Sequence, residues 1–365
     1  MIRVGVVGLG KMGLSHLSMF NAHPDLEVAG ICDSTGYLLS VLGKYTGLPT
    51  FSDLGEMLDR ADLGALVVAT PSLMHGPMVR LALERGLHVF CEKPFCLDPE
   101  ESQDLTELAE SKGLVTQVGY HYRFVGAFAE VKRLLDAGAV GRVTHVLAEA
   151  YGPVALKPQG GTWRSRKNQG GGSLYDYAAH PLNLVNWYLG EPERAAGTVL
   201  NPIFSRETDD EVYGTLYFSG GTTASLSVNW SDESQRKMTT KITIWGTHGK
   251  IFADRQEVQV YLREEADVPP GYTPGWNVKY TTELTEEVWF YVRGEEYSAQ
   301  VDAFARCIAA LDLKGLNSFA SATETDRALA MLVADAAVEP ADLPQPSRSV
   351  GPRRLRLQRP WRWTS

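Results

Sequence analysis

Short apolar runs alternate with helical patterns over roughly the first 120 residues. Five valine-rich runs are nearly continuous in apolar character, which is typical of parallel strands covered by helices on both faces. They span residues 4–7, 28–32, 65–69, 88–91 and 115–118. Between them, the apolar spacing predicts helices over residues 11–22, 78–85 and 99–111. This alternation implies right-handed βαβ units and hence a doubly wound, open parallel sheet.

After a helix predicted near residues 127–137, the pattern changes. Short strands with glycine-containing breaks are predicted at residues 143–151, 212–218, 224–230, 241–245, 250–253 and 258–262. Partial alternation of apolar and polar positions suits an antiparallel sheet with one exposed face. Helical patterns return near residues 297–311 and 321–338. We therefore expect an α/β domain over residues 1–122 and an α+β domain over residues 123–338.

Composition and charge fit a globular chain. Of 365 residues, 44% are hydrophobic and 22% are charged, and the length exceeds what one compact core usually supports. The formal net charge of −9 argues against nucleic acid or an anionic membrane as the main partner. The longest uncharged run, residues 212–231, is too rich in Gly, Ser, Thr and Asn to span a membrane. Four scattered cysteines and no signal-peptide pattern predict a cytoplasmic protein without a disulfide framework.

The C-terminal segment, residues 339–365, has a different composition. It is rich in proline and then basic, with six arginines and no acidic residue from residue 348 onward. Such a segment suits an anion-binding or nucleic-acid-binding arm, or a tail that packs on the acidic body or on a neighbouring subunit. We favour packing.

A glycine-rich turn joins the first strand to the first helix. Gly8, Gly10 and Gly13 enclose Lys11 and Met12 in a G-x-G-x-x-G pattern. The glycines permit a tight turn, close approach of a pyrophosphate and close helix–strand packing, while the helix N-terminus attracts phosphates. Asp33 follows the second strand, where a carboxylate accepts hydrogen bonds from ribose hydroxyls, and the next three residues offer no arginine for a 2′-phosphate. The pattern predicts a site for NAD rather than NADP.

Three further segments carry candidate chemistry. Thr70-Pro71, with His75 close behind, and Glu92-Lys93-Pro94 each follow a predicted parallel strand, at the edge where such sheets bind ligands. The third runs from Gly170 to Pro181 and places Asp176 four residues before His180, so that on one helix face the two could form a carboxylate–imidazole pair. Taken singly, each segment also suits an ordinary turn or a structural histidine. Pro181 further predicts that the helix begins near this proline or is kinked there.

Together, these four motifs, in this order, resemble the Gfo/Idh/MocA family (glucose–fructose oxidoreductase, inositol dehydrogenase and rhizopine catabolism). The resemblance covers nearly all of residues 1–338. It implies an N-terminal Rossmann domain and a C-terminal domain whose open, mostly antiparallel sheet often builds a homodimer or homotetramer. It also implies an oxidoreductase that uses a nicotinamide cofactor on a hydroxyl of a sugar, polyol or sugar nucleotide.

The resemblance also assigns roles to residues. Lys93, Asp176 and His180 match the catalytic trio, with His180 as the general base, Asp176 orienting its imidazole and Lys93 binding the substrate oxygen. The cofactor-binding set comprises Gly8, Gly10, Lys11, Met12, Gly13, Asp33, Thr70, Pro71, His75, Glu92, Lys93, His121, Trp163 and Arg164. The substrate-binding set comprises Lys93, Tyr120, Arg164, Asp176 and His180. His121 stands where many members carry asparagine.

Other chemistries find little support in the sequence. The histidines and cysteines lack metal-ligand spacing, and no G-x-S-x-G elbow occurs. Between residues 150 and 175 there are four basic residues and no acidic one (Lys157, Arg164, Arg166 and Lys167), which suits an anionic substrate group, the cofactor's phosphates or a solvated loop. Two alternatives stay open: a glycosidase or epimerase that uses transient redox with tightly bound NAD, and a non-catalytic NAD-binding sensor.

Overall fold

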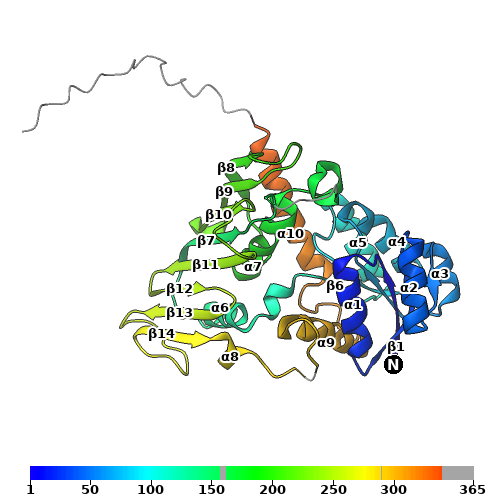
Figure 1. The fold of residues 1–365 in the computed structure, drawn as a ribbon. Coiled ribbons are helices and arrows are strands. Elements are labelled where there is room, and N and C mark those ends of the chain that lie inside the picture. The colour runs from blue at the N-terminus through cyan, green and yellow to red at the C-terminus, as the bar shows by residue number, and fades with distance from the viewer. Residues whose placement is uncertain (157–161, 289, 339–365) are drawn as a thin grey trace, which may run out of the picture.

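A computed structural model describes residues 1–156, 162–288 and 290–338, in which two sheets are joined by helices (Figure 1). The basic C-terminal tail lies outside the described residues. The first sheet has six parallel strands in the order β3-β2-β1-β4-β5-β6. The strands are β1 (Ile2–Val7), β2 (Leu26–Cys32), β3 (Thr50–Phe51), β4 (Ala65–Val68), β5 (His88–Cys91) and β6 (Thr116–Val118). The order reverses between β1 and β4, which opens a crevice at the carboxyl ends of these strands.

Five helices connect these strands: α1 (Lys11–Ala22), α2 (Gly36–Thr46), α3 (Leu54–Arg60), α4 (His75–Glu84) and α5 (Pro99–Ser111). Asp53 and Asp98 cap α3 and α5 by accepting hydrogen bonds from backbone N–H groups of the first turn. The strands β1, β4 and β5 are almost fully buried because helices cover both faces. The predicted doubly wound parallel sheet is confirmed.

The second sheet has eight strands in the order β14-β13-β12-β11-β7-β10-β9-β8. Every neighbouring pair is antiparallel except β7 with β10, which confirms the predicted mostly antiparallel sheet. The strands are β7 (Val143–Tyr151), β8 (Arg194–Asn201), β9 (Glu211–Tyr217), β10 (Thr223–Asn229), β11 (Thr239–Gly246), β12 (Gly249–Ala253), β13 (Glu257–Leu262) and β14 (Gly275–Tyr280). Buried and half-buried residues alternate along β10, since one face of the sheet packs on helices α6 (Gly126–Asp136), α7 (Ala179–Leu189) and α10 (Phe319–Ala336), as Figure 1 shows.

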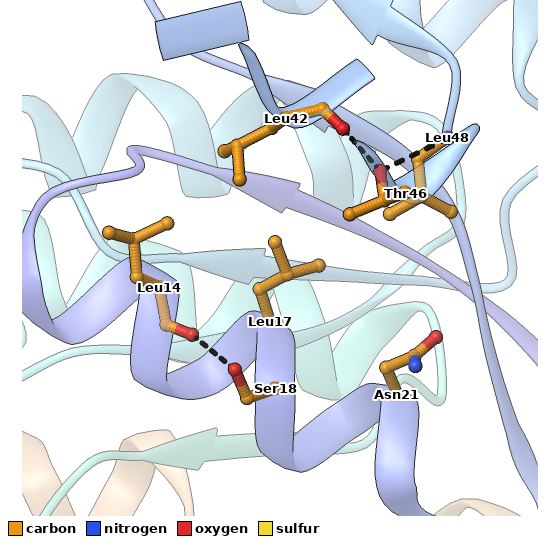
Figure 2. Close-up of a pocket in the computed structure, with 7 residues that line it drawn as sticks. All are labelled: Leu14, Leu17, Ser18, Asn21, Leu42, Thr46 and Leu48. Carbon is orange, nitrogen blue, oxygen red and sulfur yellow. Dashed lines mark hydrogen bonds between the residues drawn. The ribbon is translucent and has the colours of Figure 1, made fainter. Parts of the chain in front are cut away.

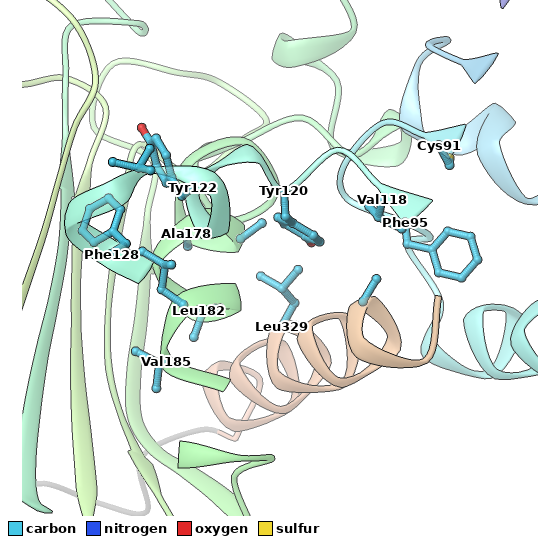
Figure 3. Close-up of a cluster of buried hydrophobic side chains, with 14 of the residues drawn as sticks. Cys91, Phe95, Val118, Tyr120, Tyr122, Phe128, Ala178, Leu182, Val185 and Leu329 are labelled. Atoms are coloured by element: carbon cyan, nitrogen blue, oxygen red, sulfur yellow. The ribbon is translucent and has the colours of Figure 1, made fainter. Parts of the chain in front are cut away.

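Packing crosses the boundary expected near residue 122. Helix α9 (Glu295–Ala310) places Val301 and Phe304 in the same apolar cluster as Val4 and Val6 of β1. A second cluster runs from the first sheet past α10 to the second sheet, with Leu329 of α10 lying between them (Figure 3). The two sheets therefore share buried surface, which holds the crevice of the first sheet against the helices of the second.

The short helix α8 (Thr281–Leu284) and several single helical turns complete the described chain. None of the described helices has both the length and the apolar character needed to cross a membrane.

Candidate active site

The glycine-rich turn is shaped by close contacts at two of its glycines. Gly8 has a φ of +85°, and a Cβ there would stand 2.7 Å from the carbonyl oxygen of Ala69. A Cβ at Gly13 would overlap the carbonyl oxygen of Gly8. A Cβ at Gly10, by contrast, would meet no atom within 4 Å beyond the adjoining residues of the chain, so the backbone of Gly10 is open to a ligand. Because no side chain caps the N-terminus of α1, its free N–H groups fit a pyrophosphate.

Asp33 lies directly after β2 with its carboxylate at the same turn. One carboxylate oxygen accepts a hydrogen bond from the Leu9 N–H at 2.6 Å, and the other accepts one from the Thr35 N–H at 2.8 Å. Burial alone would raise the pKa of this carboxyl, but these backbone donors outweigh it and lower the pKa. Asp33 therefore stays ionised, and its free lone pairs suit the ribose hydroxyls of NAD.

A cleft of about 880 Å³ opens between the first sheet and the helices of the second half. Eight of the predicted site residues line it: Lys11, Met12, Glu92, Lys93, His121, Arg164, Asp176 and His180. They come from segments up to 169 positions apart in sequence, at the carboxyl edge of the first sheet and on the α7 side of the second half. The cleft is large enough for a nicotinamide and a small substrate together.

Lys93 and Asp176 form the charged centre of this cleft. The Lys93 ammonium donates to one Asp176 carboxylate oxygen at 2.8 Å and to the Asp176 carbonyl oxygen at 2.9 Å. Arg164 Nε donates to the other carboxylate oxygen at 3.0 Å, while its guanidinium lies 4.8 Å from the centre of the Trp163 ring. Burial would raise the pKa of Asp176, but Lys93 and Arg164 lower it to about 2.

The sequence interpretation of Asp176 as a partner for His180 needs correction. Both carboxylate oxygens of Asp176 are engaged by cations, and no hydrogen bond to His180 is present among the described contacts. A carboxylate binds a cationic donor more strongly than a neutral imidazole, so Lys93 and Arg164 win the competition. Asp176 therefore fixes the position of Lys93.

His180 lies among aromatic rings on the cleft wall. Its ring centre is 4.9 Å from that of Tyr122 and 5.2 Å from that of His121, and its Nδ1 is buried without a partner among the described residues. Burial, followed by the positive charge of Lys93, lowers the pKa of His180 well below its usual value. Its imidazole is therefore neutral at pH 7.

The helix around His180 shows how Pro181 is accommodated. A π-helical turn, Leu174–Ala178, runs into α7, which begins at Ala179, two residues before the proline. This agrees with the predicted helix start near Pro181. The wider π turn relieves the clash that a proline ring makes with the carbonyl four residues earlier, and it places Asp176 and His180 on the cleft.

The glycines before this turn allow close packing within the protein and do not form a ligand site. A Cβ at Gly171 would overlap the carbonyl of Arg164, and a Cβ at Gly172 would stand 2.5 Å from the Asp209 carboxylate. Their close approach holds the Trp163–Ser165 turn against the start of the π helix. Of the other basic residues in this region, Arg166 and Lys167 are exposed and do not line the cleft, and Lys157 lies outside the described residues.

Glu92 has a partner that sequence reasoning missed. Its carboxylate lies 2.6 Å from Nε2 of His16, a fully buried residue of α1. Burial would raise the pKa of Glu92, but His16 and then Lys93 lower it, so the carboxylate is charged on the cleft wall. No local signal marks this pair, because the two residues are 76 positions apart.

Several predicted residues lie away from the cleft lining. His75 is buried, with its ring nitrogens 2.9 Å from the Pro94 carbonyl oxygen and 3.0 Å from that of Thr70, so it ties together the turns after β4 and β5. Tyr120 is 1% exposed and packs in the apolar cluster of Figure 3, which does not bring it to the substrate. Pro71, Thr70 and Trp163 are likewise outside the lining.

Residues of the second half complete the cleft and escaped the sequence analysis. Tyr297 of α9 stacks on His121, with ring centres 4.5 Å apart. Arg255 pairs with the buried Glu296 and lies 5.6 Å from the centre of the Tyr122 ring. Burial, and next Arg255, lower the pKa of His121 to about 3, so this imidazole is also neutral.

A smaller hollow of about 370 Å³ lies between α1 and α2 (Figure 2). It is lined by Leu14, Leu17, Ser18, Asn21, Leu42, Thr46 and Leu48. The hydroxyls of Ser18 and Thr46 donate to backbone carbonyls of their own helices, and none of these seven residues is titratable. This hollow therefore offers no acid–base chemistry.

Comparison with known proteins agrees with this geometry. The model of an oxidoreductase family with an NAD-binding Rossmann fold matches residues 2–120, and that of the GFO/IDH/MocA C-terminal domain matches residues 128–252. The scyllo-inositol 2-dehydrogenase (NAD(+)) of Bacillus subtilis is 26% identical over 293 residues, covering 78% of this chain and 84% of that protein. Levoglucosan dehydrogenase of Pseudarthrobacter phenanthrenivorans is 28% identical over 304 residues, covering 73% of this chain and 78% of that protein.

Solved structures show the same fold. A levoglucosan dehydrogenase in complex with NADH and levoglucosan superimposes with a TM-score of 0.81 at 24% identity, covering 94% of this chain and all of that one. The parallel sheet, the glycine turn and the shared cleft define an NAD(H)-dependent oxidoreductase. The chain belongs to the Gfo/Idh/MocA family.

Proposed function

We propose that this oxidoreductase transfers a hydride between NAD(H) and a secondary hydroxyl or ketone of a sugar, cyclic polyol or sugar nucleotide, with Lys93 and His180 as the catalytic residues. The observation that carries the assignment is the placement of a fixed ammonium and a neutral imidazole on the wall of one cleft, beside the cofactor turn. Alcohol oxidation needs such a pair, because a proton must leave the hydroxyl oxygen while a hydride leaves the carbon.

Lys93 binds the substrate oxygen in this proposal. Two of the three N–H bonds of the ammonium donate to Asp176, which leaves one N–H bond free to point into the cleft. A fixed positive charge stabilises the negative charge that develops on the oxygen as the hydride departs. Asp176 is a positioning residue that keeps this ammonium in place.

His180 accepts the hydroxyl proton. Its low pKa keeps the imidazole in the unprotonated form that a base requires at neutral pH. In the reverse direction, His180 returns a proton to the carbonyl oxygen. The neighbouring neutral ring of His121 and the Tyr122 ring exclude water from this wall and preserve the low polarity that sets the pKa.

The residues that would hold the cofactor fit NAD. Gly8, Gly10 and Gly13 shape the phosphate turn, and the Asp33 carboxylate would accept hydrogen bonds from the ribose hydroxyls. When bound, the nicotinamide accepts or returns the hydride. An ionised Asp33 would repel a 2′-phosphate, which favours NAD over NADP.

Steady-state kinetics of three proteins tests this proposal. The wild type, His180→Ala and Lys93→Ala are incubated with NAD and a panel of inositols, aldoses, sugar acids and nucleotide sugars, and NADH is followed by absorbance. We expect turnover of one class by the wild type and a loss of kcat by about 10²- to 10⁴-fold in each variant. NAD affinity, measured separately by calorimetry, should change by less than about threefold in His180→Ala, since this residue is outside the expected cofactor-binding set.

Other outcomes distinguish the remaining functions. Release of NAD from the denatured wild type, with no net NADH formed, would favour a glycosidase or epimerase that oxidises and re-reduces its substrate. Full activity of His180→Ala would contradict the assigned base. Tight NAD binding without any turnover would favour the sensor.

We further propose that the protein forms a homodimer or homotetramer. The second sheet supports this, since helices cover only one of its faces among the described residues.

We also propose that the protein acts in the cytoplasm. The four cysteines are unpaired, and three of them are buried. Unpaired thiols are the usual state in a reducing compartment.

A further inference from the structure

The cleft is positively charged although the chain as a whole is acidic. Among the described residues, seven cationic side chains line it (Lys11, Lys93, Arg164, Arg236, Lys237, Arg255 and Arg293), together with three carboxylates (Glu92, Asp176 and Glu296). The whole chain has a formal net charge of −9. A cluster of one sign inside a cleft focuses its field on a ligand of the opposite sign.

Most of these cations already have partners. Lys93 and Arg164 bind Asp176, and Arg255 binds Glu296. Arg293 donates to the Ser15 hydroxyl on α1, 2.8 Å away, and its guanidinium lies 4.9 Å from the centre of the Tyr297 ring. The Lys11 ammonium has no partner among the described residues, but Lys11 begins α1 directly after the glycine turn, and we assign it to the phosphates of the cofactor.

Arg236 and Lys237 remain. Both are exposed, and neither makes an ion pair or a hydrogen bond with any residue that the structure describes. Two adjacent cations repel one another, so the free protein gains nothing by placing them together on the rim of a binding cleft. Their arrangement becomes favourable when an anion lies between them.

The position of this pair points to the substrate rather than the cofactor. Arg236 and Lys237 lie between β10 and β11 of the second sheet, whereas the phosphate turn follows β1 of the first. Their segment is fastened to the cleft wall because the Asp232 N–H donates to the Gly152 carbonyl oxygen at 3.2 Å, and Ser231 forms a β-bridge with Pro153. The adjoining Val154 and Met238 also line the cleft.

We infer that Arg236 and Lys237 form a subsite for an anionic group on the substrate, a carboxylate or a phosphate. The inference rests on the proposed function, in which the reacting hydroxyl lies at Lys93 and His180. It narrows the substrate class to acidic sugars or polyols: uronic and aldonic acids, sugar or inositol phosphates, and nucleotide sugars.

Matched pairs of compounds test the subsite. D-Glucuronate is compared with D-glucose, and myo-inositol 1-phosphate with myo-inositol, so that the first pair tests the carboxylate and the second the phosphate. Binding to the enzyme–NADH complex is measured by the fluorescence of the bound NADH, and turnover by NADH formation. We expect one charged compound to bind at least about tenfold more tightly than its neutral partner, with a preference that declines as salt is added.

The double variant Arg236→Ala/Lys237→Ala should lose that preference, with KM for the charged compound rising about tenfold or more and kcat changing less than about threefold. Lys44→Ala/Lys314→Ala removes the same charge from exposed positions outside the cleft and should behave as the wild type. This control separates a local contact from the field of the whole molecule.

The outcomes separate the subsite from the dehydrogenase function. Turnover of neutral compounds with no advantage for charged ones would overturn the subsite and leave the proposed function intact. Binding of a charged compound that the double variant loses, without turnover by any protein, would support the subsite and contradict the dehydrogenase. Equal binding of both members of each pair by the wild type would overturn the subsite regardless of turnover.

Discussion

At the scale of single residues, burial and the charges near His180, the proposed base, predict the pH range in which the enzyme is active. The imidazole is neutral because it is buried and because the positive charges of Lys93 and Arg255 oppose its protonation. A base with a lowered pKa is active above that pKa and loses activity as the pH falls through it. The acidic limb of kcat/KM for alcohol oxidation should therefore lie well below pH 6.5.

Arg255→Met should move this acidic limb to higher pH. Removing the cation makes protonation of His180 easier, because Arg255 is one of the charges that lower the pKa of His180. The measurement is kcat/KM against pH with saturating NAD. Arg255→Lys retains the charge and should keep the limb near its original pH. An unchanged limb in Arg255→Met would show that Arg255 does not act on the base.

At the scale of secondary-structure elements, α10 is fastened to the first half through a buried carboxyl. Asp326 of α10 accepts hydrogen bonds from the Ser102 hydroxyl at 2.7 Å and from the Cys96 N–H at 3.0 Å. Its other carboxyl oxygen is buried without a partner among the described residues. Burial raises the pKa of Asp326 to about 7. Above that pH, the junction contains a buried charge.

The raised pKa gives this junction a defined pH dependence. Between the unfolded pKa near 4 and the folded pKa of about 7, the folded protein binds the proton more tightly, so the contribution of Asp326 to stability falls as the pH rises. Asp326→Asn keeps an acceptor for Ser102 and Cys96 and cannot ionise. The unfolding free energy of the variant minus that of the wild type should therefore be larger at pH 8 than at pH 5. We expect this increase to be on the order of 1–4 kcal/mol.

Urea denaturation of both proteins at the two pH values measures this gain. Glu110→Gln, at an exposed position on α5, is the matched control and should show no such difference. If the difference in unfolding free energy between the variant and the wild type is the same at pH 5 and pH 8, Asp326 does not titrate between these values.

The sequence predicted those elements whose pattern is complete within the segment. The bounds of α1, α5 and β7 agree with expectation because the glycine turn precedes α1, Asp98 caps α5, and Gly141 and Gly152 flank β7. By contrast, the sequence did not predict α2 or β8. Helix α2 begins with glycine, and β8 contains alanine and glycine at its centre. Tertiary packing supplies what the local propensity of these segments lacks.

The same limit applies to the site. Lys93, Asp176 and His180 are marked by motifs, and the structure places all three on the cleft. The partner of Asp176 could not be inferred from helical spacing, since Lys93 reaches it from a strand end 83 positions earlier. The pairing of His16 with Glu92 could not be inferred either, because it forms only once α1 packs beside β5.

At the scale of the whole molecule, the second sheet has one face with no covering helix among the described residues. Helices α6, α7 and α10 lie on its other face (Figure 1). On the open face, Leu147 of the central strand β7 is flanked in register by Ser225 and Thr243, and the aromatic side chains of Tyr151 and Trp245 lie half-buried nearby. A broad face of this kind, with apolar residues at its centre, is suited to a self-complementary contact with a second copy.

Leu147→Arg should therefore dissociate the proposed oligomer without disturbing the cofactor site. A charged side chain at the centre of a buried interface loses its hydration without gaining a partner, which weakens association by about 100-fold or more. Light scattering on a sizing column should give two or four chains for the wild type and one for the variant, while NAD affinity stays within about twofold. Leu147→Met retains an apolar side chain and should retain the assembly. A wild type that is monomeric at high concentration, or a Leu147→Arg variant of unchanged mass, would show that copies do not associate through this face.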